Sequence, residues 1–337
     1  MEENKQHKTA LPETEPIPSA QAPEALLDIR GLRVEYHTDE DVVYAVNGLD
    51  LTIGKGESLG LVGETGAGKT TTALSVLRLI ADPPGKIMGG EIWFEGEDML
   101  QAKPARLREI RGSKISVIFQ DPMTSLNPVY SVGDQIAEVI HQHEKCSKEE
   151  GRRKAGDMLE MVGIPRARYD EYPHQFSGGM KQRVVIAMSI ACSPELILAD
   201  EPTTALDVTI QAQVLELMNE LKEKLRTSLL LITHDLGVVA QVCDRVAIMY
   251  AGEIVESGTI AEVFDHPHHP YTIGLFGSIP SLDETAEKLK PIQGQMPDPT
   301  ELPEGCAFAP RCPYATGACR TRKPEMTGVG GTQMVRC

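Results

Sequence analysis

A glycine-rich stretch, GETGAGKT at residues 63–70, has the composition and spacing of a loop that binds phosphate groups. Glycine permits positive φ angles and close backbone approach, so successive N–H groups can surround a phosphate at the start of a helix. We expect Lys69 to reach the β- and γ-phosphates of a nucleotide and Thr70 to hold Mg²⁺. A chance glycine-rich turn is the alternative, but the position between a predicted strand and a predicted helix favours a nucleotide site. The predicted nucleotide-binding residues here are Gly63, Glu64, Thr65, Gly66, Ala67, Gly68, Lys69, Thr70 and Thr71.

Two adjacent carboxylates, Asp200 and Glu201, follow the apolar run at residues 196–199. Taken alone, a strand that ends in Asp-Glu is usually only a solvated turn. Beside a phosphate loop, however, Asp200 is placed to hold Mg²⁺ and Glu201 to orient the attacking water.

Two further polar side chains follow predicted strands. His234 comes after the run at residues 229–232 and could hydrogen-bond a γ-phosphate or position Glu201, although a lone histidine there is more often structural. Gln120 opens the loop QDPMTSLNP, and its amide could sense Mg²⁺ and the attacking water. The predicted catalytic residues are Glu201, His234 and Gln120. The predicted Mg²⁺ ligands are Thr70, Gln120 and Asp200.

The elements that must position these residues read as an α/β domain. Short apolar runs bounded by turn signals predict strands at 26–34, 44–53, 58–62, 115–119, 196–199, 229–232 and 246–249. A helix is expected at 69–80, and residues from about 121 to 185 read as a helical insertion. A further helix starts near Asp207, because apolar residues recur there at three- and four-residue spacing. That core stripe is Ile210, Val214, Leu217, Leu221 and Leu225.

Composition excludes several classes of protein. The net charge of −16, from 33 basic and 49 acidic residues, repels polyanions and argues against nucleic acid as a partner. The longest apolar runs fall far short of the roughly 18 residues that a membrane span needs. Residues 1–25 hold five Glu and four Pro without an apolar segment, so we expect a disordered tail, no signal peptide and a cytoplasmic chain.

Residues 176–183, FSGGMKQR, resemble the signature motif of ATP-binding cassette (ABC) proteins. The resemblance implies a P-loop NTPase (RecA-like) ABC nucleotide-binding domain, in which Ser177, Gly178 and Gly179 cap the γ-phosphate held by an opposite subunit. It also implies that Gln120 is the Q-loop, Asp200 and Glu201 the Walker B pair, residues 205–207 the ALD motif, and His234 the switch. Phe176 and Met180 depart from the commonest signature, LSGGQ, but leave the phosphate-contacting residues intact.

An aromatic side chain that stacks on adenine is expected before the phosphate loop in this family. Tyr36 fits best because it follows the first predicted strand, and Tyr44 is the second choice. Either residue could instead be an ordinary strand aromatic.

Three segments narrow the resemblance to the ATPase subunits of bacterial oligopeptide and dipeptide importers. They are FQDPMTSLNP at 119–128, HPYTIGLFGSIP at 269–280 and the C-terminal cysteines. The resemblance implies a peripheral protein on the cytoplasmic face of the membrane. Its partners would be a second ATPase subunit, expected as a heterodimer, two transmembrane permease subunits and an extracytoplasmic solute-binding protein. The domains expected are a tail at 1–25, the ATPase domain at 26–262 and a Cys-containing C-terminal extension at 263–337.

Four of the seven cysteines, Cys306, Cys312, Cys319 and Cys337, crowd into the last 32 residues. Four thiolates could hold Zn²⁺ or an iron–sulfur cluster, or could stay free. The C-x₂-C pairs typical of structural zinc are absent, and the family resemblance implies a [4Fe-4S] cluster. The tract of His266, His268 and His269 has a metal-like composition but is interpreted as a linker.

Three other functions are alternatives to peptide import. Importers of nickel or glutathione share this type of ATPase. A soluble ABC protein acting on DNA or ribosomes is disfavoured, because only 108 positions separate Lys69 from Ser177, too few for a long coiled coil, and because the chain has one cassette. An inactive regulatory binder is opposed by the presence of Glu201 and His234.

Overall fold

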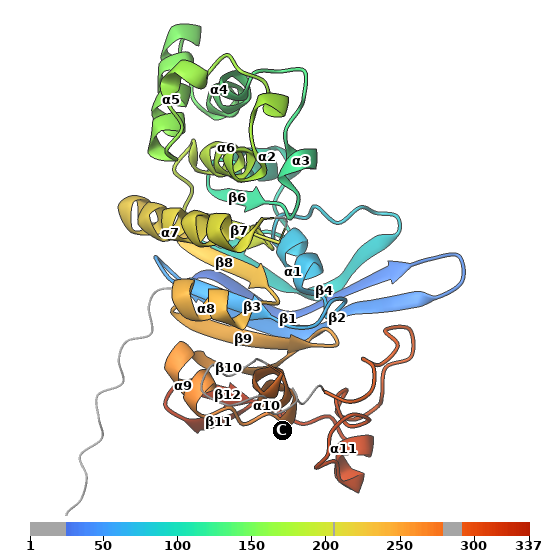
Figure 1. Ribbon diagram of the computed structural model, residues 1–337. Coiled ribbons are helices and arrows are strands. Elements are labelled where there is room, and N and C mark those ends of the chain that lie inside the picture. The colour runs from blue at the N-terminus through green and yellow to red at the C-terminus, as the bar shows by residue number, and fades with distance from the viewer. Residues whose placement is uncertain (1–24, 205, 279–291) are drawn as a thin grey trace, which may run out of the picture.

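Two β-sheets form the frame of the protein in a computed structural model that describes residues 25–204, 206–278 and 292–337 (Figure 1). Most of the expected tail, and residue 205 of the ALD motif, lie outside these residues. The strands are β1 (Ala25–His37), β2 (Val42–Gly54), β3 (Ser58–Val62), β4 (Gly85–Phe94), β5 (Glu97–Asp98), β6 (Ile115–Ile118), β7 (Leu196–Asp200), β8 (Ser228–Thr233), β9 (Arg245–Tyr250), β10 (Glu253–Thr259), β11 (Thr327–Gly330) and β12 (Gln333–Val335).

Helices follow or cover these strands. The α-helices are α1 (Lys69–Val76), α2 (Pro104–Ile110), α3 (Pro122–Ser125), α4 (Val132–His143), α5 (Lys148–Met161), α6 (Gly178–Ile190), α7 (Val208–Leu225), α8 (Leu236–Val242), α9 (Ile260–Asp265), α10 (Pro270–Gly277) and α11 (Gly317–Thr321). Two 3-10 turns are η1 (Arg166–Arg168) and η2 (Pro173–Gln175). In the part of the chain that the structure describes, we find no helix long and apolar enough to cross a bilayer.

The larger sheet has the order β11-β12-β10-β9-β3-β8-β7-β6. Strands β9, β3, β8, β7 and β6 are parallel, and every residue of β3, β7 and β8 is buried. Such uniformly apolar strands suit a sheet covered on both faces. In register, Val62 at the end of β3 lies opposite Thr233 of β8, and Asp200 at the end of β7 lies opposite Ile232. The phosphate loop, the carboxylates and His234 therefore emerge at the same edge.

The smaller sheet, β2-β1-β4-β5, is antiparallel and packs its apolar face into a second core cluster. It carries Tyr36 near the end of β1. Strand β4 was absent from the sequence-based prediction, because its residues Gly85–Phe94 contain three glycines and little alternation.

The helical insertion predicted at about 121–185 contains helices α3 to α6, which lie together at the top of Figure 1. Helix α7 begins at Val208 with Asp207 as its N-cap, and its stripe packs as expected, with Val214, Leu217 and Leu221 buried. Helix α1 is shorter than predicted, since it ends at Val76 rather than near residue 80.

The C-terminal segment adds two strands to the large sheet, because β12 pairs with β10, and β11 with β12. The boundary expected near residue 263 falls within α9. Phe308 is 2% exposed and belongs to the same core cluster as Tyr250 of β9. The segment after residue 263 thus shares both sheet and core with the residues before it.

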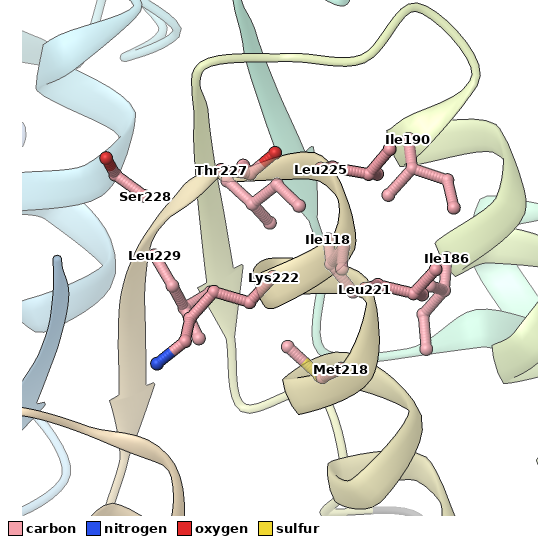
Figure 2. Close-up of a pocket in the computed structure, with 11 residues that line it drawn as sticks. Ile118, Ile186, Ile190, Met218, Leu221, Lys222, Leu225, Thr227, Ser228 and Leu229 are labelled. Carbon is pink, nitrogen blue, oxygen red and sulfur yellow. The ribbon is translucent and has the colours of Figure 1, made fainter. Parts of the chain in front are cut away.

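A small apolar cavity of about 20 Å³ lies between α6, α7 and β8 (Figure 2). Ile186, Ile190 and Leu221 face it, while the Lys222 ammonium points away and donates to Ser58 Oγ at 2.6 Å. Thr227 Oγ1 is likewise satisfied by Pro194 O at 2.8 Å. No polar groups converge on this space, so we interpret it as a packing void rather than a ligand site.

Candidate functional site

The phosphate loop connects β3 to α1, and two of its glycines have left-handed backbones, with φ of 85° at Gly66 and 101° at Gly68. A β-carbon at Gly68 would collide with the carbonyl oxygen of Ala45, and one at Gly63 with that of Met249. Only glycine can adopt the positive φ angle at position 68 and also avoid the collision with the Ala45 carbonyl oxygen. The sequence therefore folds here into a tight loop that directs N–H groups to the start of α1.

Lys69 is the first residue of α1 and is only 6% exposed. Its Nζ donates to the carbonyl oxygens of Gly63 at 2.7 Å and Glu64 at 3.0 Å. The Lys69 side chain therefore reaches from the end of the loop back to its first two residues. Burial lowers the pKa of Lys69, and the nearby carboxylates of Glu201 and Asp200 counteract that shift. The ammonium is thus held beside the loop in a site where its charge is poorly solvated.

Thr70 and Asp200, two of the predicted Mg²⁺ ligands, lie within hydrogen-bonding distance of each other. Burial raises the pKa of Asp200, and a hydrogen bond with the Thr70 side chain acts in the opposite direction. A hydroxyl and a carboxylate supply the hard oxygen ligands that Mg²⁺ prefers. The two side chains therefore fit the ion.

Glu201 is the centre of a hydrogen-bonded group that unites all three predicted catalytic residues. Gln120 Nε2 donates to Glu201 Oε2 at 2.8 Å, and His234 Nδ1 lies 3.3 Å from Oε1. Thr204 Oγ1 also donates to Oε2, at 2.9 Å. Glu201 has a φ of 46°, an unusual backbone for a non-glycine residue and one that clusters at functional sites.

Sequence reasoning missed Thr204, although its hydroxyl contacts the same carboxylate as Gln120. The available signal was its position three residues after Glu201 in the turn that follows β7. Threonine commonly makes local hydrogen bonds over such a spacing.

Tyr36 and Tyr44 lie in different surroundings. Tyr36 Oη is 3.2 Å from Thr71 Oγ1 in α1, so its ring reaches the phosphate-loop helix. Tyr44 is 38% exposed, and its backbone N–H donates to Pro299 O at 2.9 Å. Of the two, Tyr36 is the one whose side chain contacts α1, the helix that follows the loop.

The signature-like motif begins helix α6. Ser177 is the N-cap and accepts a hydrogen bond from the Met180 N–H at 3.4 Å. Gly179 packs against Ile210 so closely that a β-carbon would collide with that side chain. Gly178 and Gly179 occupy the first turn, whose N–H groups have no partner within the helix.

The four C-terminal cysteines are neighbours but do not form a ligand set. The Cys306 N–H donates to Cys319 O at 2.8 Å. Burial raises the pKa of Cys306, with Cys337 and Cys319 adding to the shift, and that of Cys337, with Cys312 and Cys319 adding. Within residues 25–204, 206–278 and 292–337, no three His, Cys, Asp or Glu side chains are placed to hold a metal ion. The cluster and the zinc alternative both remain predictions.

The histidine tract has a structural part in the fold. His269 is 1% exposed and caps α10, where its Nδ1 accepts a hydrogen bond from the Tyr271 N–H at 3.1 Å. Burial lowers the pKa of His269 to about 4, so the ring is neutral. The His268 and His269 N–H groups both donate to the buried Glu256 carboxylate.

Comparison with protein families gives two matches. Residues 46–204 match the ABC transporter family. Residues 255–319 match the C-terminal region of the oligopeptide/dipeptide transporters. Among solved structures, the chain resembles the ATP-binding cassette MJ0796 in a dimeric post-hydrolysis state with ADP and Pi. The TM-score is 0.63 at 27% identity, over 69% of this chain and 98% of that one.

Curated relatives match over nearly their whole lengths. The oligopeptide transport ATP-binding protein AppD of Bacillus subtilis is 49% identical over 93% of this chain and 96% of its own. The dipeptide transport protein DppD of the same organism is 48% identical over 93% and 94%. OppD of Haemophilus influenzae is 48% identical over 93% and 96%. The chain therefore belongs to the ABC transporter family, in its group of oligopeptide and dipeptide transport ATP-binding proteins.

Proposed function

We propose that this chain hydrolyses ATP at the site built from β3, β7 and β8 and thereby powers the import of dipeptides or oligopeptides. The observation that carries the proposal is the position of Glu201, which is held by Gln120 and His234 at the edge of the sheet where Lys69 lies. The ABC transporter match supports the ATPase, and the C-terminal match and the named relatives support peptides as the transported substrate.

The residues of the site would divide the work of phosphoryl transfer. Lys69 and the N–H groups of the loop would hold the phosphates of ATP and neutralise their charge. Mg²⁺ would be held by Thr70 and Asp200, with Gln120 nearby, and would offset charge on the β- and γ-phosphates. Tyr36 would stack on the adenine.

Glu201 would orient the attacking water and accept one of its protons. The water oxygen forms a bond to the γ-phosphorus as the bond from that phosphorus to the bridging oxygen breaks, releasing ADP and phosphate. Gln120 and Thr204 hold one carboxylate oxygen and His234 contacts the other, which fixes the direction in which Glu201 faces. Such fixed geometry is a large part of catalysis in this reaction class.

A second ATPase subunit would complete the site. Ser177, Gly178 and Gly179 of each subunit would cover the γ-phosphate bound by the other, using the free N–H groups at the start of α6. The dimeric state of the similar cassette supports this arrangement. We propose a heterodimer, as in the importers that the sequence resembles.

The permease subunits would dock on the helical insertion at the cytoplasmic face of the membrane. A cleft of about 780 Å³ there is lined by Tyr130, Glu138, His141 and Arg152, among others. Tyr130 is 54% exposed, and the cleft includes Ser125 and Asn127 of the segment that starts at Gln120. A docked permease helix could thereby move Gln120 relative to Glu201. A solute-binding protein outside the membrane would deliver the peptide.

The C-terminal cysteines would hold a [4Fe-4S] cluster, with Zn²⁺ as the alternative. The four thiols of the C-terminal segment and its resemblance to the peptide importers support the proposal, although the described residues do not bring three ligands together. Four thiolates are the usual ligands of such a cluster.

Reconstitution of the whole importer tests the function. The complete importer consists of this chain, the second ATPase, both permeases and the binding protein, and it is placed in lipid vesicles. These vesicles should take up a dipeptide or oligopeptide only when ATP is present on the side of the membrane where the ATPase subunits lie. Vesicles with Glu201→Gln in this chain should lose that uptake. Uptake of Ni²⁺ or glutathione with no peptide transport would reject the peptide as substrate while leaving the ATPase in place.

A further inference from the structure

The C-terminal segment reaches the phosphate loop through an ion pair. Arg311 Nη1 lies 3.0 Å from Oε1 and 3.1 Å from Oε2 of Glu64, although 247 positions separate the two residues. The Arg311 side chain is 6% exposed and that of Glu64 is 32% exposed. The pair is therefore well shielded on the arginine side, unlike the solvent-exposed pairs on α5, such as Arg153 with Asp157.

The orientation of Arg311 is fixed by groups other than Glu64. Its Nε donates to Gln293 O at 3.1 Å, and its Nη1 also donates to Tyr250 Oη at 3.3 Å. The guanidinium carbon lies 5.8 Å from the ring centre of Tyr250 and 5.9 Å from that of Phe308. A guanidinium that is held in this way loses little further freedom when it binds a carboxylate.

The rings beneath Arg311 join the C-terminal segment to the sheet. Tyr250 of β9 packs on Tyr271 of α10 at 4.6 Å and on Phe308 at 5.2 Å between ring centres, and all three are buried. Tyr271 Oη accepts a hydrogen bond from the backbone N–H of Glu64 at 3.0 Å. Both the backbone and the side chain of Glu64 are thus held from the C-terminal side.

A second contact supports the loop two residues further on. A β-carbon at Gly66 would lie 3.3 Å from Met296 Cε, so this methionine packs beside the loop glycine. The segment from Ile292 to Arg311 therefore contacts the loop at Gly66 as well as at Glu64.

The Glu64 carboxylate is close enough to act on the nucleotide site. It is one of the three carboxylates that raise the pKa of Lys69 against the effect of burial, and the Glu64 carbonyl accepts a hydrogen bond from Lys69 Nζ. A negative side chain beside a loop that receives phosphates repels them unless a cation offsets its charge. Arg311 is the cation that the fold supplies.

We propose that Arg311 is a positioning residue for ATP binding, which holds Glu64 and neutralises its carboxylate so that the phosphate loop can accept the nucleotide. The proposal rests on the proposed function, because it assigns Arg311 a part in the same ATP site. Arg311 touches neither the phosphates nor the water in this assignment. It acts through Glu64 and the loop backbone.

The direct test is a comparison of ATP binding and turnover in the assembled complex. With Arg311→Ala, the KM for ATP and the Kd for a fluorescent ATP analogue should rise about five- to tenfold, while kcat changes less than twofold. Arg311→Lys, which keeps a positive charge, should recover most of the affinity. Arg322→Ala is the matched control, because Arg322 is an exposed arginine of the same segment, and it should bind ATP as the unaltered chain does.

A double variant separates charge neutralisation from a general loss of packing. Glu64→Gln combined with Arg311→Ala removes both charges and should bind the analogue more tightly than Arg311→Ala alone. Unchanged affinity in Arg311→Ala, or equal weakening in Arg311→Lys, Arg311→Ala and the double variant, would overturn the proposal. Failure of the unaltered complex to hydrolyse ATP would instead reject the proposed function.

Discussion

The side-chain amide of Gln120 donates a 2.8 Å hydrogen bond to the carboxylate of Glu201, across 81 positions of sequence. Gln120 lies five positions before Ser125, which lines the cleft of the helical insertion, and Glu201 directly follows β7. One bond therefore links the surface on which we expect the permease to the group that we expect to orient water. A shift of the helical insertion would therefore move Glu201, the residue that we expect to orient the attacking water.

The first prediction concerns Glu201. Glu201→Gln should leave ATP binding nearly intact, because Lys69, Thr70 and Asp200 remain, but should lower steady-state hydrolysis by roughly 10²- to 10⁴-fold. A glutamine keeps the size of the side chain and its bond with Thr204 or His234, so the fold should be preserved. Nucleotide binding and phosphate release in the assembled complex give the two readouts. Near-normal turnover would remove Glu201 from the catalytic role.

Sequence patterns could predict which residues the fold brings together here, because each part of the candidate site is short and continuous in sequence. The loop at 63–70 is continuous in sequence, and Asp200 ends, and Glu201 directly follows, a strand whose five residues are all buried. Parallel strands bring their carboxyl ends to one edge, which made the meeting of Lys69, Glu201 and His234 foreseeable.

Other relationships depend on the tertiary fold alone. Nothing near Arg311 in the sequence marks it as the partner of Glu64, since ion-pair partners so far apart are chosen by the packing of whole elements. Strand β12 has three residues, too few for any periodicity to appear, and forms because β10 offers it an edge. The contact between the C-terminal segment and the phosphate loop likewise could not be predicted from sequence patterns, because it depends on the packing of whole elements.

The second prediction compares two aromatic residues. Tyr36→Ala should weaken nucleotide binding by about 1 to 3 kcal/mol, by analogy with the stacking of bases on aromatic rings. Tyr44→Ala is the control, because Tyr44 is more exposed and is bonded to Pro299 through its backbone, which the substitution keeps. Titration with an ATP analogue measures both. A loss confined to the Tyr44 variant would reverse the assignment.

The third prediction concerns the dimer. Ser177→Arg places a bulky cation at the start of α6 and should impair hydrolysis at the phosphate loop of the partner subunit. Binding of ATP to this chain's own loop should change little, because Ser177 lies on a different element from Lys69. Photolabelling each subunit with an azido-ATP would distinguish the two sites. Full hydrolysis by a strictly monomeric preparation would contradict the shared site.

The fourth prediction follows from the buried His269. Its pKa is lowered to about 4 by burial, against about 6.5 in an unfolded chain, so the unfolded state binds more protons between these values. This group therefore costs stability as pH falls from about 6.5 to 4, by up to about 3 kcal/mol. His269→Asn keeps a side-chain acceptor for the Tyr271 N–H but does not titrate. Urea unfolding across this pH range should show a smaller acid loss in the variant, and equal slopes would refute the prediction.

The last prediction concerns the cysteines at 306, 312, 319 and 337. Their segment contains few large apolar side chains apart from the buried Phe308, so a centre that joins distant thiolates would contribute much of its stability. An anaerobic preparation should be brown and contain about four irons and four sulfides per chain if the four thiolates hold a cubane cluster.

Cys312→Ser should lose both iron and sulfide, whereas Cys192→Ser, at a cysteine in another part of the fold, should keep them. Because Arg311 adjoins Cys312 and pairs with Glu64, removal of the cluster should also raise the KM for ATP, by less than Arg311→Ala does. Metal analysis that found stoichiometric zinc, or no metal, would refute the cluster. The ATPase site at Lys69 and Glu201 would stand in either case, since none of its ligands comes from these cysteines.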